Sequence, residues 1–381
     1  MKILLIDSFE FMTKEDKING IFTFDQARIL KQNKFEVDIL SPGLFSFKDL
    51  FKKKKYKKFQ RVNKISIYRK YEKNIIPFSF GFLNLLIAKK ISFISIKLFD
   101  EYLKKNSKPD LIHAHKIRFS LYAAYAIYLK YKIPFIVTEH NSDIILNKFP
   151  TSLKTYTKKI IKHSKNFNTV SILASSKIKK FFNLKRVDVL NNVLPDVFCE
   201  NQNKKIKKRE TYSFLSVSRF DENKNIEMLI NVFIENFGDK NAKLDLVGGG
   251  KLINEFRDYI NKKGFQNKIK LYNFLSRKKI LRFYQKCDCF VIPSHKETFG
   301  LTLFEALLFK KYFITSRHSG FHELKHIDIK IPNFNSINQN ELKKLMLHAF
   351  YSRTKFDYKK KIIKNFGKKR FIDTIRRIYK Y

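Results

Sequence analysis

Apolar and polar positions in the first half of the chain alternate between short buried runs and longer amphipathic stretches. Apolar runs at residues 2–6 and 135–138 predict strands that are buried on both faces. Stretches at about 80–105 and 120–131 have the spacing and length of helices. Strands that alternate with helices form a mainly parallel sheet with helices on both faces, so we expect a doubly wound α/β domain over residues 1–200.

A second alternation follows a polar, charged stretch at residues 201–210, which predicts a linker. We expect residues 211–358 to form a second doubly wound domain, with strands at 213–217, 243–247, 269–272, 289–292 and 312–315. Apolar residues at helical spacing over 359–381 predict a C-terminal helix that packs back on the first domain. Ligands bind at the carboxyl ends of the strands in such sheets, so the strand ends of the two domains would enclose a cleft.

Composition sets the broad class of protein. The chain has 381 residues, of which 44% are hydrophobic, so it can form two to three domains of roughly 150 residues and is not wholly disordered. Its cysteines, Cys199, Cys287 and Cys289, lack the spacing of a zinc site or of a disulfide framework. We therefore expect the protein to reside in a reducing compartment, the cytoplasm. The first apolar run is too short for a signal peptide, and residues 75–88 are fewer than the roughly 20 that span a membrane.

The formal net charge is +45, and it is spread over both halves of the chain. It is locally densest in Lys48–Lys73 and Arg353–Lys380, which each hold 12 basic and 2 acidic residues. Such density attracts nucleic acid or lipid headgroups, unless it only reflects a chain that is rich in lysine throughout. A basic nucleic-acid-binding protein is therefore one alternative. Because the charge is diffuse and no recognised binding motif supports it, we expect no nucleic acid as a partner.

The polar residues with the clearest chemistry follow strands of the second domain. Arg219 and Lys224 come after its first strand, where two cations can clamp a diphosphate. Glycines 248–250 follow the next strand and let the backbone approach a ligand closely. Glu297 and Glu305 lie around the start of an expected helix, where carboxylates can accept hydrogen bonds from sugar hydroxyls. Each signal alone is weak, because basic loops, turn glycines and surface acids are common.

Taken in order, these segments resemble the retaining nucleotide-sugar glycosyltransferases of the GT-B fold that form glycosyltransferase family 4. The resemblance covers nearly the whole chain and is densest from Ser213 to Glu323. The family's Glu-x7-Glu motif and its Gly-Arg-x4-Lys-Asn segment are matched at Glu297, Phe299, Gly300, Glu305 and Ala306, and at Arg219, Lys224 and Asn225.

The first half of the chain is similar to the family more loosely. Gly20 resembles the second glycine of a loop that lies near the donor. The segment 109–115 resembles a strand end with a His-x-His pattern, and we expect structural roles for both of its histidines, His113 and His115. His140, in Thr-Glu-His, resembles a histidine that faces the sugar.

Four departures from the family pattern concern glycines. Asn19 and Ser319 stand where the first glycine of a pair is usual, Ser218 stands before Arg219, and Lys311 stands before an expected strand. Asn19 and Ser319 change how the backbone would approach the donor, but no departure removes a charged group from the expected site.

The resemblance implies an α/β chain of the GT-B fold, with two Rossmann-like, doubly wound domains that face each other across a cleft. It implies a catalytic set of Arg219, Lys224, Glu297 and His140, and a donor-binding set of Gly20, Gly249, Phe299, Gly300, Leu301 and Glu305. Within these sets the two cations would stabilise the leaving diphosphate, Glu297 would hold the transferred sugar, and Glu305 would hold the ribose.

The resemblance further implies a nucleoside diphosphate sugar as donor, no metal and no other cofactor, and a glycan or lipid-linked acceptor in bacterial surface polysaccharide assembly. We expect a cytoplasmic protein that contacts the inner face of the membrane through Lys48–Lys73, whose interleaved apolar residues can anchor it on anionic lipid. The alternatives with the same fold are a nucleotide-sugar epimerase and a phosphorylase. The Glu-x7-Glu segment together with Arg219 and Lys224 favours transfer, and no pyridoxal lysine is identified for a phosphorylase.

Overall fold

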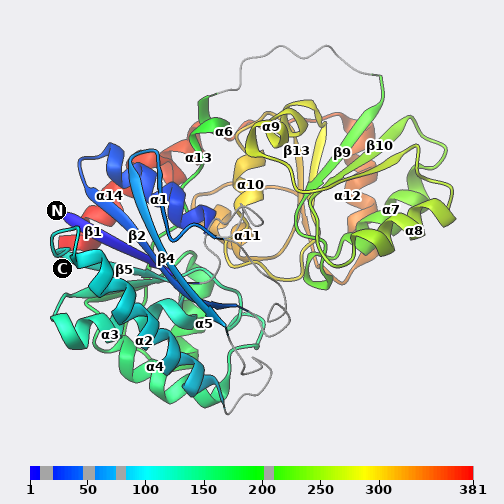
Figure 1. Ribbon diagram of the computed structural model, residues 1–381. Helices are drawn as coiled ribbons and strands as arrows, with labels where there is room; N and C mark the ends of the chain where they lie inside the picture. The colour runs from blue at the N-terminus through cyan, green and yellow to red at the C-terminus, as the bar shows by residue number, and fades with distance from the viewer. Residues whose placement is uncertain (9–19, 46–55, 74–82, 201–209, 381) are drawn as a thin grey trace. The chain divides into compact units, whose positions relative to one another are not determined.

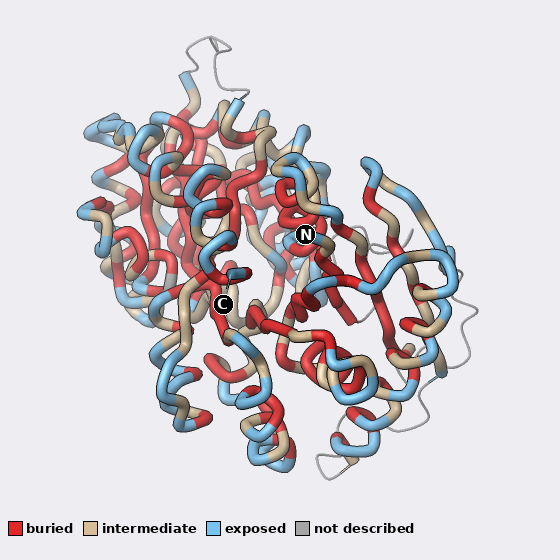
Figure 2. The backbone as a smooth tube through the Cα atoms, turned by 90° about the vertical axis from the view of Figure 1, so that its left-hand side faces the viewer, coloured by how far each residue is buried: buried red, intermediate tan, exposed pale blue. Residues whose placement is uncertain are grey.

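The computed structural model describes residues 1–8, 20–45, 56–73, 83–200 and 210–380 (Figure 1). The chain divides into two compact units. Unit 1 comprises Met1–Val193 together with Lys368–Tyr381, and unit 2 comprises Leu194–Gly367. Each unit has a sheet and helices of its own. In Figure 2, buried residues line the interior of the units, and exposed residues lie on surface helices and loops.

The strands described in unit 1 form one sheet in the order β3-β4-β2-β1-β5-β6-β7-β8. All neighbouring strands are parallel except β3 and β4. The strands are β1 (Lys2–Asp7), β2 (Glu36–Phe45), β3 (Phe59–Val62), β4 (Ile65–Lys73), β5 (Leu111–His115), β6 (Phe135–Glu139), β7 (Asn166–Thr169) and β8 (Asp188–Val189). The helices are α1 (Ile21–Gln32), α2 (Asn84–Leu103), α3 (Tyr122–Tyr131), α4 (Lys154–Ile161), α5 (Ile172–Phe182) and α14 (Lys368–Lys380).

Strand β1 supplies both hydrophobic cores of unit 1, because successive side chains of a strand point to opposite faces. Leu4 and Ile6 pack into the core that α2, α3 and α5 cover. Ile3 and Leu5 pack into the opposite core, which α1 and α14 cover. Apolar residues on both faces explain why the sequence shows a continuous apolar run here.

The strands described in unit 2 form a second parallel sheet in the order β11-β10-β9-β12-β13-β14. They are β9 (Tyr212–Val217), β10 (Ala242–Val247), β11 (Ile269–Tyr272), β12 (Cys289–Ile292), β13 (Tyr312–Ser316) and β14 (Asn333–Phe334). The helices are α6 (Asp196–Glu200), α7 (Ile226–Phe237), α8 (Ile253–Lys262), α9 (Arg277–Lys286), α10 (Leu301–Ala306), α11 (Ser319–His326), α12 (Gln339–Ser352) and α13 (Lys359–Phe366). Residues from α7, α8 and α12 pack with β9, β10 and β12 in one core.

The structure corrects two expectations about the chain's ends and boundaries. The units divide between Val193 and Leu194 rather than at residue 200. The C-terminal segment is two helices rather than one, because the extended backbone of Gly367 ends the first of them. Glycine is needed at this position, since a Cβ there would lie 2.3 Å from the Ile363 carbonyl oxygen. Only α14, the second of these helices, belongs to unit 1. The linker expected at 201–210 lies, except for residue 210, outside the described residues.

The basic segment Lys48–Lys73 contains a hairpin that was not among the expected elements. From residue 56 onward it is described, and β3 and β4 pair in antiparallel fashion around Asn63 and Lys64, both with positive φ. A two-residue loop with positive φ at both positions is the common hairpin turn, and Asn favours it. Its first part, residues 48–55, lies outside the described residues.

None of the described helices combines the length and the apolar character that crossing a membrane requires.

Candidate active site

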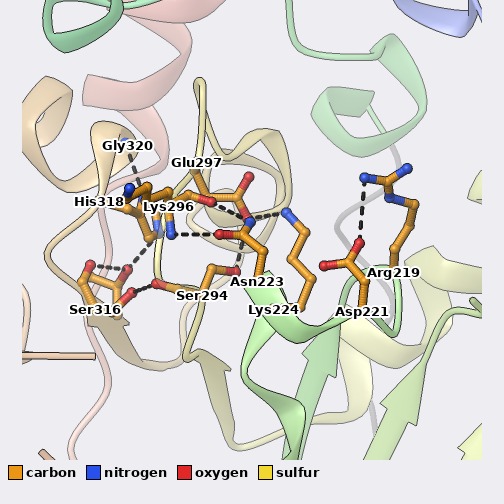
Figure 3. A network of polar contacts seen from close by, with 11 residues as sticks. Arg219, Asp221, Asn223, Lys224, Ser294, Lys296, Glu297, Ser316, His318 and Gly320 are labelled. Atoms are coloured by element: carbon orange, nitrogen blue, oxygen red, sulfur yellow. Dashed lines mark hydrogen bonds and ion pairs between the residues drawn. The ribbon is translucent and has the colours of Figure 1, made fainter. Parts of the chain in front are cut away.

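An ion pair at the carboxyl ends of β9 and β12 forms the centre of the candidate site in unit 2. The Lys224 Nζ lies 2.6 Å from Glu297 Oε1, and Ser294 Oγ donates to the same oxygen at 2.9 Å (Figure 3). The side chains of Lys224 and Glu297 are 13% and 16% exposed. Burial acts to raise the pKa of the Glu297 carboxyl, but the Lys224 ammonium and the other groups around it outweigh burial, so that pKa lies below its usual value.

Asparagines join the loop after β9 to the loop after β12. The Asn223 side chain donates to the Lys296 carbonyl at 2.8 Å and accepts from the Lys296 amide at 3.2 Å. Asn225 is left-handed, with a φ of 53°, and donates to the carbonyls of Pro293 and Ser336. Asn tolerates this conformation better than most residues, which explains why an Asn can follow the lysine. These contacts fix Lys224 against the segment that carries Glu297.

Arg219 does not join the ion pair. Its Nη2 lies 3.4 Å from Asp221 Oδ2, and its side chain is 71% exposed. In Figure 3 Arg219 and Asp221 lie to one side of Lys224, which points toward Glu297. Arg219 is therefore accessible to an anionic ligand. Binding one would replace its exposed contact with Asp221, and exposed ion pairs of this kind contribute little to stability.

Two glycines in unit 2 are required by close packing. Gly300 caps the start of α10 with a φ of 81°, and a Cβ there would lie 2.9 Å from the His318 ring. Gly248 has a φ of 154°, and a Cβ there would lie 1.7 Å from the Ser218 carbonyl oxygen. The neighbouring Gly249 lies against the exposed Phe274 ring. The positive-φ backbone explains why glycine occurs here in the sequence.

His318 is a residue of this site that sequence reasoning missed. It is buried, accepts from the Gly320 amide through Nδ1 at 3.0 Å, and shares a hydrogen bond with Thr315 Oγ1 through Nε2. Burial lowers the pKa of His318 to about 4, against the opposite effect of Glu297. The only sequence signal was a histidine in the loop that carries the Ser319 departure.

The second glutamate of the motif, Glu305, lies on α10 and is 6% exposed. Its Oε2 accepts a hydrogen bond from the Tyr284 hydroxyl at 3.0 Å, and Tyr284 is fully buried on α9. The side chain of Phe299 is also buried, stacked on Phe304 with 4.4 Å between ring centroids. Phe299 can therefore face a ligand only through its backbone, whereas Leu301 is partly exposed. Tyr284 was missed because nothing in the sequence of α9 distinguishes it from the other apolar residues of that helix.

The candidate residues of unit 1 gather where β5 and β6 end. Gly20 is left-handed, with a φ of 80°, and precedes α1. Phe22, in the first turn of α1, is parallel to the His140 ring, with 6.5 Å between centroids. His115 Nδ1 lies 2.9 Å from His140 Nε2. The structure thus brings Gly20 and His140 together through Phe22, while Asn19 lies outside the described residues.

In the described part of the chain, no group of three or more His, Cys, Asp and Glu side chains has an arrangement that could hold a metal ion.

Two family models match the chain. The model described as Glycosyltransferase Family 4 matches residues 20–194, and the model described as Glycosyl transferases group 1 matches residues 198–328. Among curated proteins, an uncharacterized glycosyltransferase of Methanocaldococcus jannaschii, MJ1178, is 25% identical over 280 residues, which are 71% of this chain and 75% of that protein.

Solved structures with the same fold cover the whole chain. Sucrose-phosphate synthase from Thermosynechococcus elongatus has a TM-score of 0.74 at 14% identity, with coverage of 100% of this chain and 98% of that one. Anabaena HepE in complex with UDP and glucose has a TM-score of 0.72 at 15% identity, with coverage of 100% and 99%. The two family matches adjoin at the boundary between the units, and together they show that the chain belongs to the family 4 glycosyltransferases, enzymes of the GT-B fold.

Proposed function

We propose that this glycosyltransferase moves a sugar, with retention of configuration, from a nucleoside diphosphate sugar to a glycan or lipid-linked acceptor. The observation that carries the proposal is the largely buried contact between Lys224 and Glu297. It joins a cation suited to phosphate with a carboxylate suited to hydroxyls at neighbouring strand ends. The HepE complex with UDP and glucose supports a donor of this class.

In the proposed reaction the bond between the sugar and the diphosphate breaks while the acceptor oxygen bonds to the same carbon. Negative charge develops on the departing diphosphate, and Lys224 and Arg219 stabilise it without a metal ion. Glu297 accepts hydrogen bonds from the transferred sugar, and His140 is proposed as a further group that binds that sugar. The proton of the acceptor hydroxyl passes to a phosphate oxygen of the departing diphosphate, which lies on the face from which the acceptor must attack for the configuration to be retained.

A panel of nucleotide sugars tests the donor class. The wild-type enzyme is expected to hydrolyse one donor slowly in the absence of acceptor, and that donor is expected to raise the melting temperature. Addition of EDTA should leave the rate unchanged. Proton NMR of the newly released sugar should show the anomeric configuration of the donor. Inversion would overturn the retaining assignment, and a loss of activity with EDTA would overturn the metal-independent one. An epimerised nucleotide sugar, or a free sugar phosphate, would favour one of the alternatives.

We also propose that unit 1 docks on an anionic lipid surface, where lipid-linked acceptors of surface polysaccharides are found. In the described part of Lys48–Lys73, the edge strand β3 exposes Phe59, and exposed cations lie in and beside it at Lys57, Lys58, Arg61 and Lys64. Cations near a membrane surface contribute about 1 kcal/mol each, and an exposed aromatic ring can enter the headgroup region.

Helix α2 supports the same docking surface. It packs against β4 and exposes Leu85, Leu86 and Phe93 together with Lys89 and Lys97. Leu86, Lys89, Phe93 and Lys97 recur every three or four positions, and Leu85 lies four positions before Lys89, so these residues share one face of the helix. Arg69, by contrast, is buried and hydrogen-bonded to the Lys57 carbonyl, so it does not contribute.

Matched charge reversals test the docking. Vesicles that contain acidic lipid should bind the wild-type protein at low salt and release it as salt rises. The double variant Lys57→Glu, Lys58→Glu should bind several-fold more weakly. The double variant Lys343→Glu, Lys344→Glu reverses two exposed neighbouring lysines of α12 and is the control. Equal weakening by both variants would mean that net charge alone, rather than this surface, governs binding.

A further inference from the structure

The buried histidines of unit 1 form a connected cluster rather than separate structural contacts. His113 and His115 lie two residues apart on β5 and therefore share one face of the sheet. Their ring centroids are 4.3 Å apart. His115 is fully buried, and its Nδ1 lies 2.9 Å from Nε2 of His140, the residue that follows β6. The side chain of His115 thus reaches from β5 to the histidine that the proposed function places against the sugar.

The contact between His115 and His140 requires one ring to donate and the other to accept. Burial lowers the pKa of His140 to about 3 and the pKa of His115 well below its usual value, so both rings are neutral at pH 7. A neutral imidazole carries one N–H, so the direction of this hydrogen bond decides which nitrogen of His140 holds the proton.

The surroundings favour donation from His115. His115 Nε2, His140 Nδ1 and Asn192 Oδ1 are all buried without a hydrogen-bond partner among the described residues. The Asn192 side chain nevertheless lies near His140 and acts to raise the pKa of that ring. This direction is the one expected when a side-chain oxygen accepts from the imidazole, because such a hydrogen bond favours the protonated ring. If His115 donates, His140 carries its proton on Nδ1, on the side of Asn192. The atom of His115 that stays unpaired is then Nε2, which in this tautomer is an acceptor without a hydrogen. The opposite direction leaves an N–H of His115 buried without a partner, which is the rarer and costlier arrangement.

The other side of the cluster is held by the C-terminal helix. His113 Nδ1 lies 3.0 Å from the Tyr379 hydroxyl on α14, and His113 Nε2 lies 2.8 Å from Thr138 Oγ1 on β6. Both nitrogens of His113 are therefore occupied, and its ring cannot turn without breaking a buried hydrogen bond. His115 packs against this fixed ring, so its own orientation toward His140 is restrained.

We propose that His115 is a positioning residue: it donates from Nδ1 to His140 Nε2, and so fixes the orientation of the His140 ring and places the His140 proton on Nδ1. This inference rests on the proposed function for the role of His140, but the hydrogen bond itself does not. It replaces the purely structural role that the sequence alone suggested for His115.

Two substitutions separate the hydrogen bond from the bulk of the ring. In His115→Asn the side-chain amide can take the place of Nδ1 and keep a donor toward His140, whereas in His115→Gln it takes the place of Nε2 and does not. We expect His115→Gln to lower kcat by about tenfold or more, as loss of a residue that orients a functional group does. His115→Asn should stay within about threefold of the wild-type kcat on the same reasoning, and KM for the donor should change little in both.

A double-mutant cycle shows whether His115 acts through His140. His115→Gln should have no further effect on kcat in a His140→Ala background. Equal losses in His115→Asn and His115→Gln, or the same loss with and without His140, would overturn the proposal.

Nitrogen-15 NMR of histidine-labelled wild-type protein provides a readout that needs neither activity nor a variant. His140 is expected to show a protonated Nδ1 and an unprotonated Nε2. The reverse pattern would overturn the assigned direction of the hydrogen bond. If no nucleotide sugar is turned over, or if His140→Ala is fully active, the proposed function or the role of His140 fails instead, while the NMR pattern still decides whether His115 sets the proton position.

Discussion

Two glutamates at strand ends, the buried Glu139 in unit 1 and the largely buried Glu297 in unit 2, have pKa values shifted in opposite directions. Burial raises the pKa of Glu139 to about 7, although its carboxylate accepts hydrogen bonds from the backbone amides of Ile117 and Asn141. Glu297 is also penalised by burial, but the Lys224 ammonium brings its pKa below the usual value. Hydrogen bonds from amides alone do not offset burial here, and a full positive charge does.

The difference teaches how the surroundings of each glutamate set its charge. In unit 1 the imidazoles of His113, His115 and His140 are neutral and lie near a carboxyl that is easily protonated, because the nearby Lys116 pairs with Asp7 rather than with Glu139. Unit 2 uses a charged pair that keeps Glu297 ionised. A charged pair suits a site that must stabilise developing phosphate charge, whereas neutral hydrogen bonds suit contacts to uncharged sugar hydroxyls.

Removing the cation of unit 2 should have the largest effect. Lys224→Ala is expected to lower kcat by about 10²–10³, because a group aimed at the charge that develops on the leaving diphosphate is lost. The pKa of Glu297 should also rise toward the behaviour of Glu139, so the acidic limb of the pH–rate profile should move to higher pH. Steady-state kinetics between pH 5 and 9 measure both changes.

Lys240→Ala is the control for Lys224→Ala, because Lys240 also pairs with a carboxylate, the exposed Asp239. Its kcat should be unchanged. A Lys224→Ala enzyme with wild-type turnover, or with an unmoved acidic limb, would break the comparison between the two glutamates. Thermal melts should show that the loss of turnover far exceeds any loss of folded protein.

Glu305→Ala tests the second carboxylate of unit 2. If Glu305 binds the ribose hydroxyls of the donor, its loss removes hydrogen bonds to a charged acceptor, and the affinity for the free nucleoside diphosphate should fall by about 10–100-fold. Titration calorimetry with the diphosphate measures this directly. An unchanged affinity would argue against the ribose contact. Of these three charged side chains, Lys224 and Glu297 would then be the ones that contact the donor.

A smaller effect is expected from Tyr284→Phe. The change removes the hydroxyl that donates to Glu305 Oε2 but keeps the buried ring, so it should weaken nucleotide binding by about 2–10-fold, the range of one hydrogen bond. Tyr312→Phe, at another buried tyrosine of unit 2, is the matched control, and its nucleotide affinity should equal the wild type. If both variants bind equally well, Tyr284 has no influence on Glu305.

Much of the fold could be predicted because the spacing of apolar residues along the chain clearly separated strands from helices. The apolar run at β12 and the continuous run at β1 are buried on both faces, and local sequence is enough to identify such strands. The hairpin β3–β4 was overlooked because its lysines outweighed the alternation of Ile65, Ile67 and Tyr71, all buried. The division of the C-terminal segment at Gly367 depends on a close backbone approach that spacing does not reveal.

The site could be predicted only as far as its motif. Spacing placed Lys224 and Glu297 at strand ends, but their contact depends on the loops that Asn223 and Asn225 join. Tyr284 reaches Glu305 through tertiary packing, and no local signal marks it. His318 bonds its near neighbours Thr315 and Gly320 as the N-cap of α11, but histidine is not among the residues that usually mark an N-cap. The contact of His115 with His140 likewise requires that β5 and β6 be neighbours in register.

The smallest effect is expected in stability, at Glu139. Its folded pKa of about 7 lies above its ordinary value of 4.5, so its contribution to stability is fully present below pH 4.5 and is lost as pH rises through 7. Glu139→Gln cannot titrate, so the stability of the wild type relative to this variant should fall between pH 4.5 and 7. Melting temperatures across that range measure the difference, which is expected to be a few degrees. Glu101→Gln, at an exposed glutamate of α2, is the control and should show no such trend. If wild-type stability relative to Glu139→Gln instead rises with pH, the two amides stabilise the carboxylate more than burial opposes it, and Glu139 would resemble Glu297 even without a lysine.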